Sequence, residues 1–219
     1  IAYFRQLIKE LYGIFDKVID HYRSDAEYRS LFGYDKRLEE LILREKRYNS
    51  NIPIARIDIF YNEATKEFCF CEFNTDGSSA MNEDRELNRG IRYTKGYEYL
   101  SEKYHLHTFE LFESWVKTSL AIYAQTEGAV ENPHVAIVDF MESATNNEFE
   151  IFADCYRKHG IECEICEIRD LTFKDGRLYG KEEKPIDLIY RRAVTSDIMA
   201  HYEEVSDFIA AVKAEAVCL

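Results

Sequence analysis

The segment PIARIDIFYNEATKEFCFCEFNTDGSS, residues 53–79, decides much of the fold of this 219-residue chain. It holds two runs rich in β-branched and aromatic residues, separated by a short polar stretch at 62–66. That pattern is typical of two antiparallel strands joined by a hairpin loop. Because side chains alternate between the two faces of a strand, the alignment of the two runs can be inferred from their parity.

Parity places four polar side chains on one face of this hairpin. If Asp58 pairs with Glu72, then Arg56 lies opposite Asn74, and the turn has about five residues. Sliding the register by one residue in each strand keeps the four together. Pairing odd positions with even ones would scatter them and would also misalign the apolar residues.

The same parity assigns the remaining side chains of the hairpin. Phe60 is expected opposite Phe70. Cys69, Cys71 and Phe73 are expected to share the other face of the second strand.

The polar face combines two carboxylates, an amide and a guanidinium. Like charges that face each other across a strand pair are destabilising, and a bound divalent cation would reverse the sign of that interaction. Mg²⁺ prefers such oxygen ligands and completes its shell with water or substrate phosphates. The alternative is a solvated polar face in which Arg56 forms a salt bridge with Glu72. The donor-rich turn at 76–79, Asp-Gly-Ser-Ser, directly follows and favours a binding site.

Three motifs in order, RxD at 56–58, ExNxD at 72–76 and IDLIYRR at 186–192, resemble the glutathionylspermidine synthase-like, circularly permuted ATP-grasp ligases. The resemblance extends from about Pro53 to the C-terminus. It implies that ATP phosphorylates a substrate carboxylate and that an amine then attacks the acyl phosphate, which forms a C–N bond. Mg²⁺ would neutralise the charge that develops during phosphoryl transfer. The implied cofactors are Mg²⁺ and ATP, and the implied substrates are a small-molecule or peptide carboxylate and an amine.

The resemblance also implies roles for individual residues. Arg56 would be catalytic and would hold the acyl phosphate or the tetrahedral oxyanion, because a planar guanidinium binds oxyanions in a bidentate manner. The implied metal ligands are Asp58, Glu72 and Asn74. The implied substrate-binding residues are Asp76, Ser78, Ser79 and Arg191.

The chain departs from the family pattern in two ways. Gly77 stands where a second serine is expected, so the identity of the acid substrate stays open. The chain has only nine glycines and neither a P-loop nor a GxGxxG motif. We therefore expect ATP to be bound mainly by ATP-grasp lobes of the same protein outside these residues, and the chain to be inactive alone. The alternative is a non-catalytic binding or interaction module that keeps the fold.

Composition limits the partners and the compartment. A net charge of −13 argues against nucleic acid, whose binding needs basic patches. No apolar run approaches the roughly 20 residues of a membrane helix, so no membrane association is expected. We expect the six cysteines to be buried and reduced and the protein to be cytoplasmic.

The CxxC at 163–166 lies in an alternating strand, which puts its two thiols on opposite faces. Redox and zinc CxxC pairs instead occupy a helix N-terminus or a turn. A zinc or thiol protein built on this pair, or on His105 and His107, is therefore the least favoured alternative.

The chain before residue 132 is expected to be mainly helical apart from the hairpin at 53–79. The three-and-four spacing of apolar residues predicts helices at 2–23, 25–33, 35–44 and about 108–125. Asp35 is expected to cap the third. Residues 78–102 interleave charges with few apolar positions, which favours a mobile or loop-like segment beside the site.

The pattern changes after residue 132. The predicted elements, in order, are a strand at 134–140, a helix from 145 or 146 to 158, a strand at 161–168, a hairpin at 171–179, a strand at 186–190 and a helix from Ser196 or Asp197 to about Val217. Strand, helix and strand within about 35 residues indicate a right-handed βαβ unit in a parallel sheet.

The expected fold class is thus α/β, with a mixture of α+β features. Residues 1–131 would form a helical region with the hairpin, and residues 132–219 a Rossmann-like pre-ATP-grasp domain. Without a glycine fingerprint we do not expect dinucleotide binding. Arg191 and Arg192 follow the end of a strand, where parity lets only one of them face a ligand, and Arg191 is favoured.

Overall fold

The computed structural model describes residues 2–45, 47–142, 144 and 146–219. It shows a mixed α/β protein with an antiparallel hairpin and a parallel sheet, as predicted. The elements in chain order are α1 (Ala2–Ser24), α2 (Ala26–Ser30), α3 (Lys36–Ile42), β1 (Arg56–Tyr61), β2 (Phe68–Asn74), α4 (Met81–Ile91), α5 (Lys95–Ser101), α6 (Leu111–Tyr123), β3 (Val135–Asp139), α7 (Asn146–Lys158), β4 (Cys163–Glu167), the 3₁₀ turn η1 (Ile168–Asp170), β5 (Thr172–Lys174), β6 (Arg177–Tyr179), β7 (Leu188–Arg191), α8 (Thr195–Ala200) and α9 (Ser206–Lys213).

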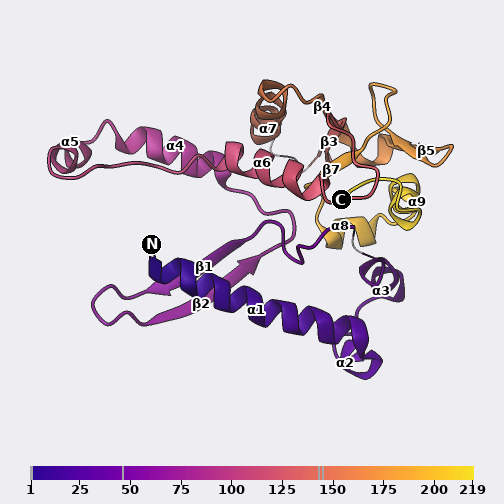
Figure 1. The fold of residues 1–219 in the computed structure, drawn as a ribbon, viewed down its shortest axis with the longest axis horizontal. Helices are drawn as coiled ribbons and strands as arrows, with labels where there is room; N and C mark the ends of the chain where they lie inside the picture. The colour runs from indigo at the N-terminus through magenta and orange to yellow at the C-terminus, as the bar shows by residue number, and fades with distance from the viewer. Residues whose placement is uncertain (1, 46, 143, 145) are drawn as a thin grey trace.

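Helix α1 lies lengthwise along the β1–β2 hairpin (Figure 1). Its apolar stripe makes the contact through aromatic rings: Phe4 lies 4.9 Å from Tyr61 and Phe15 lies 5.2 Å from Phe73, measured between ring centroids. The predicted helix over 2–23 is therefore confirmed. Helix α3 begins, as predicted, after Asp35, whose carboxylate accepts a hydrogen bond from the backbone of its first turn.

The register of the hairpin confirms the predicted polar pairs. Asp58 pairs with Glu72, and Arg56 pairs with Asn74. Directly after the first of these pairs the register shifts by one residue, so that Cys71 is an extra residue in β2 with no partner opposite it. This is a β-bulge.

The bulge changes the pairing of all residues between it and the hairpin loop. Phe60 pairs with Cys69, and not with Phe70 as predicted. Phe70 instead lies on the face of Phe73, with the two ring centroids 5.0 Å apart. The prediction that Cys69, Cys71 and Phe73 share a face is therefore wrong. The bulge gathers the phenylalanines of β2 on the face that α1 covers.

The prediction that residues 78–102 form a mobile or loop-like segment is wrong. This segment forms helices α4 and α5, an arm that extends away from the rest of the chain (Figure 1). Ala80 precedes α4 in the left-handed conformation, with φ of 80°, and has no side chain that could cap the helix. The cap comes instead from Glu148 in α7, whose Oε1 accepts hydrogen bonds from the amides of Met81 and Asn82 at 3.0 and 3.2 Å.

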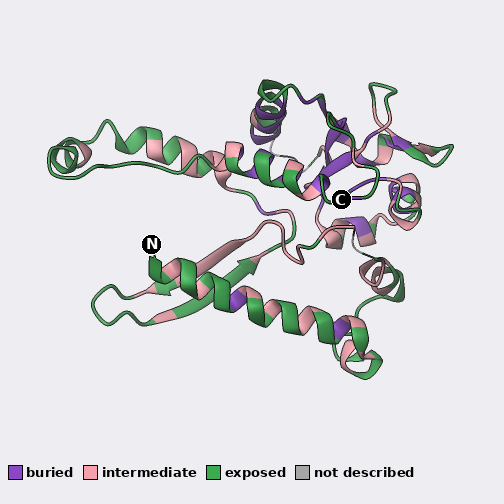
Figure 2. Ribbon diagram, in the orientation of Figure 1, coloured by how far each residue is buried: buried purple, intermediate pink, exposed green. Residues whose placement is uncertain are grey.

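Most of the core lies in the α/β unit that follows the arm, as the buried residues in Figure 2 show. Its three-stranded parallel sheet has the order β4-β3-β7, and α7 connects β3 to β4 as the predicted βαβ unit requires. Helices α6 and α7 pack on one face of the sheet, and α8 and α9 pack on the other. On the first face Trp115 of α6 lies 5.0 Å from the ring of Tyr190.

The cysteines agree in part with expectation. Cys163 packs in the core on the α6 and α7 side, and Cys166 in the core on the α8 and α9 side, so the two thiols of the CxxC lie on opposite faces as predicted. All six cysteines are free. Cys69 and Cys71 are exposed, however, like most of β2, so the prediction that all six are buried is wrong for these two.

The predicted last helix, to about Val217, is two helices. Helix α8 ends at Ala200 and α9 begins at Ser206. The turns between them bury Val205 and bring the ring of His201 to 5.3 Å from Phe140 at the end of β3, so packing on the sheet interrupts the helix. None of the described helices is long and apolar enough to cross a membrane.

Candidate functional site

The polar face of the hairpin brings together the four residues that the sequence singled out. Arg56 Nε lies 3.1 Å from Asp58 Oδ1, and Arg56 Nη2 lies 3.2 Å from Glu72 Oε1. Asn74 Nδ2 donates a hydrogen bond to the same glutamate oxygen at 3.0 Å. The hydrogen bond to Asp58, with the charge of that carboxylate, raises the pKa of Arg56.

The salt bridge between Arg56 and Glu72, expected for a simple solvated polar face, is present. The same residues also offer oxygen atoms that could bind a cation. The side chains of Arg56, Asp58 and Glu72 are 39, 38 and 53% exposed, so water can reach them. Two carboxylates, and an amide that can turn its oxygen outward, are the hard donors that suit Mg²⁺. These residues therefore fit the ion that the family resemblance implies. In the structure Arg56 contacts both carboxylates and offsets one of their two negative charges.

The turn after β2 lies against the end of β7. Gly77 has φ of 64°, and a Cβ at this position would come within 2.7 Å of the carbonyl oxygen of Arg192 and 2.9 Å of Val194 Cγ1. Both the backbone conformation and the close approach require glycine. The departure from the family pattern at Gly77 therefore has a physical cause, since a serine here would collide with the backbone after β7.

Asp76 makes the polar contact between this turn and the parallel sheet. Its Oδ1 lies 2.8 Å from Arg191 Nη1, and its Oδ2 accepts a hydrogen bond from the amide of Thr195 at 2.8 Å. Burial raises the pKa of Asp76, but the charge of Arg191 and the hydrogen bond from Thr195 outweigh it, so the pKa lies below its ordinary value. Two of the four predicted substrate-binding residues thus bind each other.

The two serines of the turn differ in availability. Ser78 is buried, and its hydroxyl donates a short hydrogen bond to the carbonyl of Asn74, so it holds the turn. Ser79 lines an open groove of about 390 Å³ between the starts of α4 and α7. The groove is otherwise lined by Asn82, Glu83, Ala144, Asn146, Asn147 and Glu148. Of the two hydroxyls, that of Ser79 is therefore the one placed at a space that could hold a ligand.

A buried ion pair forms the floor of this region. Arg192 Nη1 lies 2.8 Å from Glu148 Oε2, and each side chain is 4% exposed. Tyr190 accepts a further hydrogen bond from Arg192 at 3.2 Å. Strand parity predicted that only one of the paired arginines could face the site, and the structure shows Arg191 toward Asp76 and Arg192 toward the interior.

Sequence reasoning missed Glu148 and the asparagines beside it. The only sequence signal for these residues was their position between a buried strand and the start of a helix. Such a position lies at the carboxyl edge of a parallel sheet, where polar groups collect. After β3 the chain enters α7 on one face, and after β7 it enters α8 on the other face. The ends of β3 and β7 therefore form a topological switch point, the common location of ligand sites in such sheets.

The site thus joins two structures: an acidic hairpin face with one arginine, and a groove with amide and hydroxyl groups at the switch point. Oxygen ligands suit a hard cation, and the groove offers hydrogen-bond donors to a carboxylate. Neither a scan against protein-family models nor a search of curated proteins finds a match for this chain.

Proposed function

We propose that this chain is the metal- and acid-substrate-binding part of an ATP- and Mg²⁺-dependent carboxylate–amine ligase. The class is that of glutathionylspermidine synthase-like, circularly permuted ATP-grasp ligases, with residues 132–219 as the Rossmann-like pre-ATP-grasp domain. The observation that carries the proposal is the turn at 75–80. It connects the hairpin ligands to the switch point and is held there by the ion pair of Asp76 with Arg191.

The proposal gives each group a task. Asp58, Glu72 and Asn74 would hold Mg²⁺, which when bound neutralises phosphate charge. Arg56 would exchange a carboxylate partner for an oxyanion of the acyl phosphate, since its guanidinium already lies beside the ligand oxygens. Ser79 and the asparagines of the groove would bind the substrate carboxylate through neutral donors. Asp76 and Arg191 would position the turn.

Exposed apolar side chains on the hairpin and on the arm agree with this proposal. On the hairpin Phe60 is 71% exposed, and on the arm Leu87 and Tyr93 are 66 and 92% exposed. In the proposed ligase the nucleotide-binding lobes would pack on these faces.

The test is turnover in a protein that contains both this chain and nucleotide-binding lobes. Asp58→Asn and Glu72→Gln should each lower ADP release that requires both acid and amine by about 100-fold or more, the scale of a lost transition-state contact. Glu63→Gln, in the exposed hairpin loop, is the matched control and should retain activity. Unchanged turnover in both site variants would contradict the proposal.

A second function, a non-catalytic binding module, is favoured by one observation. Arg56 contacts both Asp58 and Glu72, so one of their two negative charges is offset without a metal ion. A coding sequence with paired lysines and a glycine-rich loop, together with ADP release that depends on both substrates, would exclude the module. The lack of any such turnover in the intact protein would favour it.

A further inference from the structure

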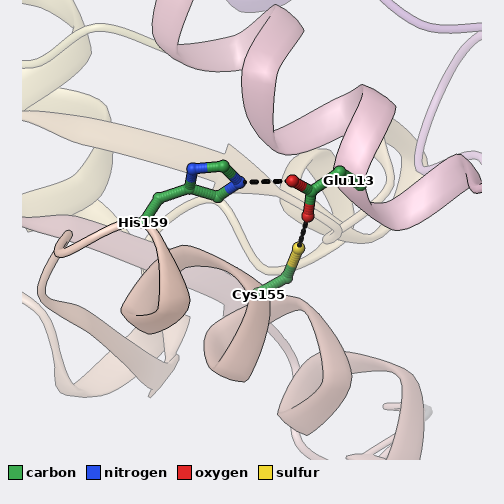
Figure 3. A group of neighbouring side chains, drawn as sticks. All are labelled: Glu113, Cys155 and His159. Atoms are coloured by element: carbon green, nitrogen blue, oxygen red, sulfur yellow. Dashed lines mark hydrogen bonds and ion pairs between the residues drawn. The ribbon is translucent and has the colours of Figure 1, made fainter.

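Three potential metal ligands meet where the start of α6 lies beside the end of α7 (Figure 3). Glu113 comes from the first turn of α6, Cys155 from the last turn of α7, and His159 from the residue after α7 ends. Glu113 Oε2 accepts a hydrogen bond from Cys155 Sγ at 3.2 Å, and Glu113 Oε1 lies 2.8 Å from His159 Nε2. One carboxylate thus lies between a thiol and an imidazole.

The packing of the two helices fixes this arrangement. Phe112, next to Glu113, lies 4.5 Å from the ring of Phe152. Two turns further along α6 and one turn further along α7, Ser119 and Tyr156 share a buried hydrogen bond of 2.7 Å. Ligands on rigid, packed helices lose little freedom when a metal ion binds, which favours binding.

The spacing and the chemistry of the three groups suit a particular class of ion. Cys155 and His159 are four residues apart, so they project from the same side of the helix end. A tetrahedral ion with bonds of about 2.0–2.3 Å has ligand atoms roughly 3.3–3.8 Å apart. The three ligand atoms here all lie within 4.8 Å of one another, so side-chain rotations suffice to bring them to such an ion. Sulfur and imidazole ligands select borderline-soft metals over Mg²⁺ or Ca²⁺.

Exposure determines the form of the site. Cys155 is buried in the core and is 7% exposed. The side chains of Glu113 and His159 are 38 and 31% exposed. One side of the cluster is therefore open to water. Lys117 Nζ, 3.3 Å from Glu113 Oε1, supplies the counter-charge at present, and its 63% exposed side chain can move away.

We propose that Glu113, Cys155 and His159 form a binding site for a divalent transition metal ion of the Zn²⁺ class, with water as the fourth ligand. On binding, the Cys155 thiol loses its proton to solvent and its sulfur becomes a thiolate ligand. The hydrogen-bonded contacts to Glu113 are replaced by bonds to the metal. The ion would join α6 to the end of α7.

Cobalt(II) is the suitable probe, because its absorption reports both thiolate coordination and tetrahedral geometry. Titration of the metal-free 219-residue chain with Co²⁺ should give a thiolate-to-cobalt charge-transfer band that saturates at one equivalent. The band should then be lost on addition of one equivalent of Zn²⁺. An excess of Mg²⁺ should not displace the ion, which separates this site from the proposed hairpin site.

Variants assign the ligands. Cys155→Ser, which keeps the shape of the side chain, should abolish the charge-transfer band. His159→Gln should weaken Co²⁺ binding by at least the ~10–100-fold that loss of an outer partner costs. Cys71→Ser, at an exposed cysteine of β2, is the matched control and should bind like the parent chain. Circular dichroism of each variant confirms that it is folded.

Two results would overturn the proposal. One is the absence of a charge-transfer band at one equivalent of Co²⁺ in the parent chain. The other is a band that survives in folded Cys155→Ser but disappears in Cys71→Ser, which would place the metal on β2. Neither result bears on the proposed ligase function, since no residue of this cluster belongs to that site.

Discussion

Replacing Gly77 by alanine tests whether the turn at 75–80 holds the hairpin to the parallel sheet. An L-residue in the left-handed conformation costs roughly 1–2 kcal/mol. The added Cβ would also lie 2.7 Å from the carbonyl oxygen of Arg192, which is backbone and can move only with the end of β7. Overpacking of this kind costs about 1–3 kcal/mol, so the total loss of unfolding free energy should be about 2–5 kcal/mol.

The matched control is Gly128→Ala. Gly128 has φ of 77°, and a Cβ built on it meets no atom of the described residues within 4 Å, so only the conformational cost remains. Urea unfolding followed by circular dichroism should show Gly77→Ala less stable than Gly128→Ala by about 1–3 kcal/mol.

Gly77→Ser restores the residue that the family pattern expects and should be no more stable than Gly77→Ala, because the same Cβ causes the clash. Equal stability of Gly77→Ala and Gly128→Ala would refute the reasoning. It would mean that the turn can move off β7 at no cost.

Three further outcomes are expected. Glu148→Ala leaves buried Arg192 without its 2.8 Å partner and should lower the unfolding free energy by about 3–5 kcal/mol in urea titrations. The control is Lys184→Ala in the exposed pair with Glu162, which should leave the unfolding free energy without a measurable change. The hydrogen bond from Arg169 lowers the pKa of Glu142 from 4.5 to about 2. The ionised carboxylate therefore stabilises the fold above its ordinary pKa, and this contribution is lost as the pH falls toward 2. Arg169→Gln should move the NMR titration midpoint of Glu142 back toward 4.5, and an unmoved midpoint would contradict the assignment. In the native chain a disulfide reagent such as DTNB should react rapidly with the two exposed cysteines of β2 and slowly with the four buried ones until urea unfolds the protein, and more than two fast thiols would contradict the burial.

The sequence predicted the hairpin and its polar pairs because alternation is a local property. Asp58 and Glu72 lie on the side of the bulge where β1 begins and β2 ends, and there the count of residues holds. Toward the hairpin loop the count fails, since the extra residue Cys71 reverses the face of Phe68, Cys69 and Phe70 in β2. The packing of phenylalanines under α1 agrees with this reversal. That packing is a tertiary contact, which the alternation of side chains along one strand cannot predict.

The sequence missed what distant contacts determine. Helix α4 can begin directly after an alanine because the carboxylate of Glu148, 67 residues from Met81, caps it. The long predicted helix at the C-terminal end is interrupted where Val205 is buried in the core. Of the candidate site, the polar pairs of the hairpin could be predicted from pattern, and so could the opposite directions of Arg191 and Arg192. The groove could not, because it exists only where α4 and α7 begin side by side.

The contact of Glu148 with α4 has a consequence for the order of folding. Because the first turn of this helix depends on a carboxylate from α7, we expect α4 to form only after the βαβ unit has closed and Arg192 has found its partner. The arm therefore reports on the state of the α/β unit, which it contacts at its start. Rapid proteolysis within 81–101 would be an early sign that the parallel sheet, at some distance, has begun to open.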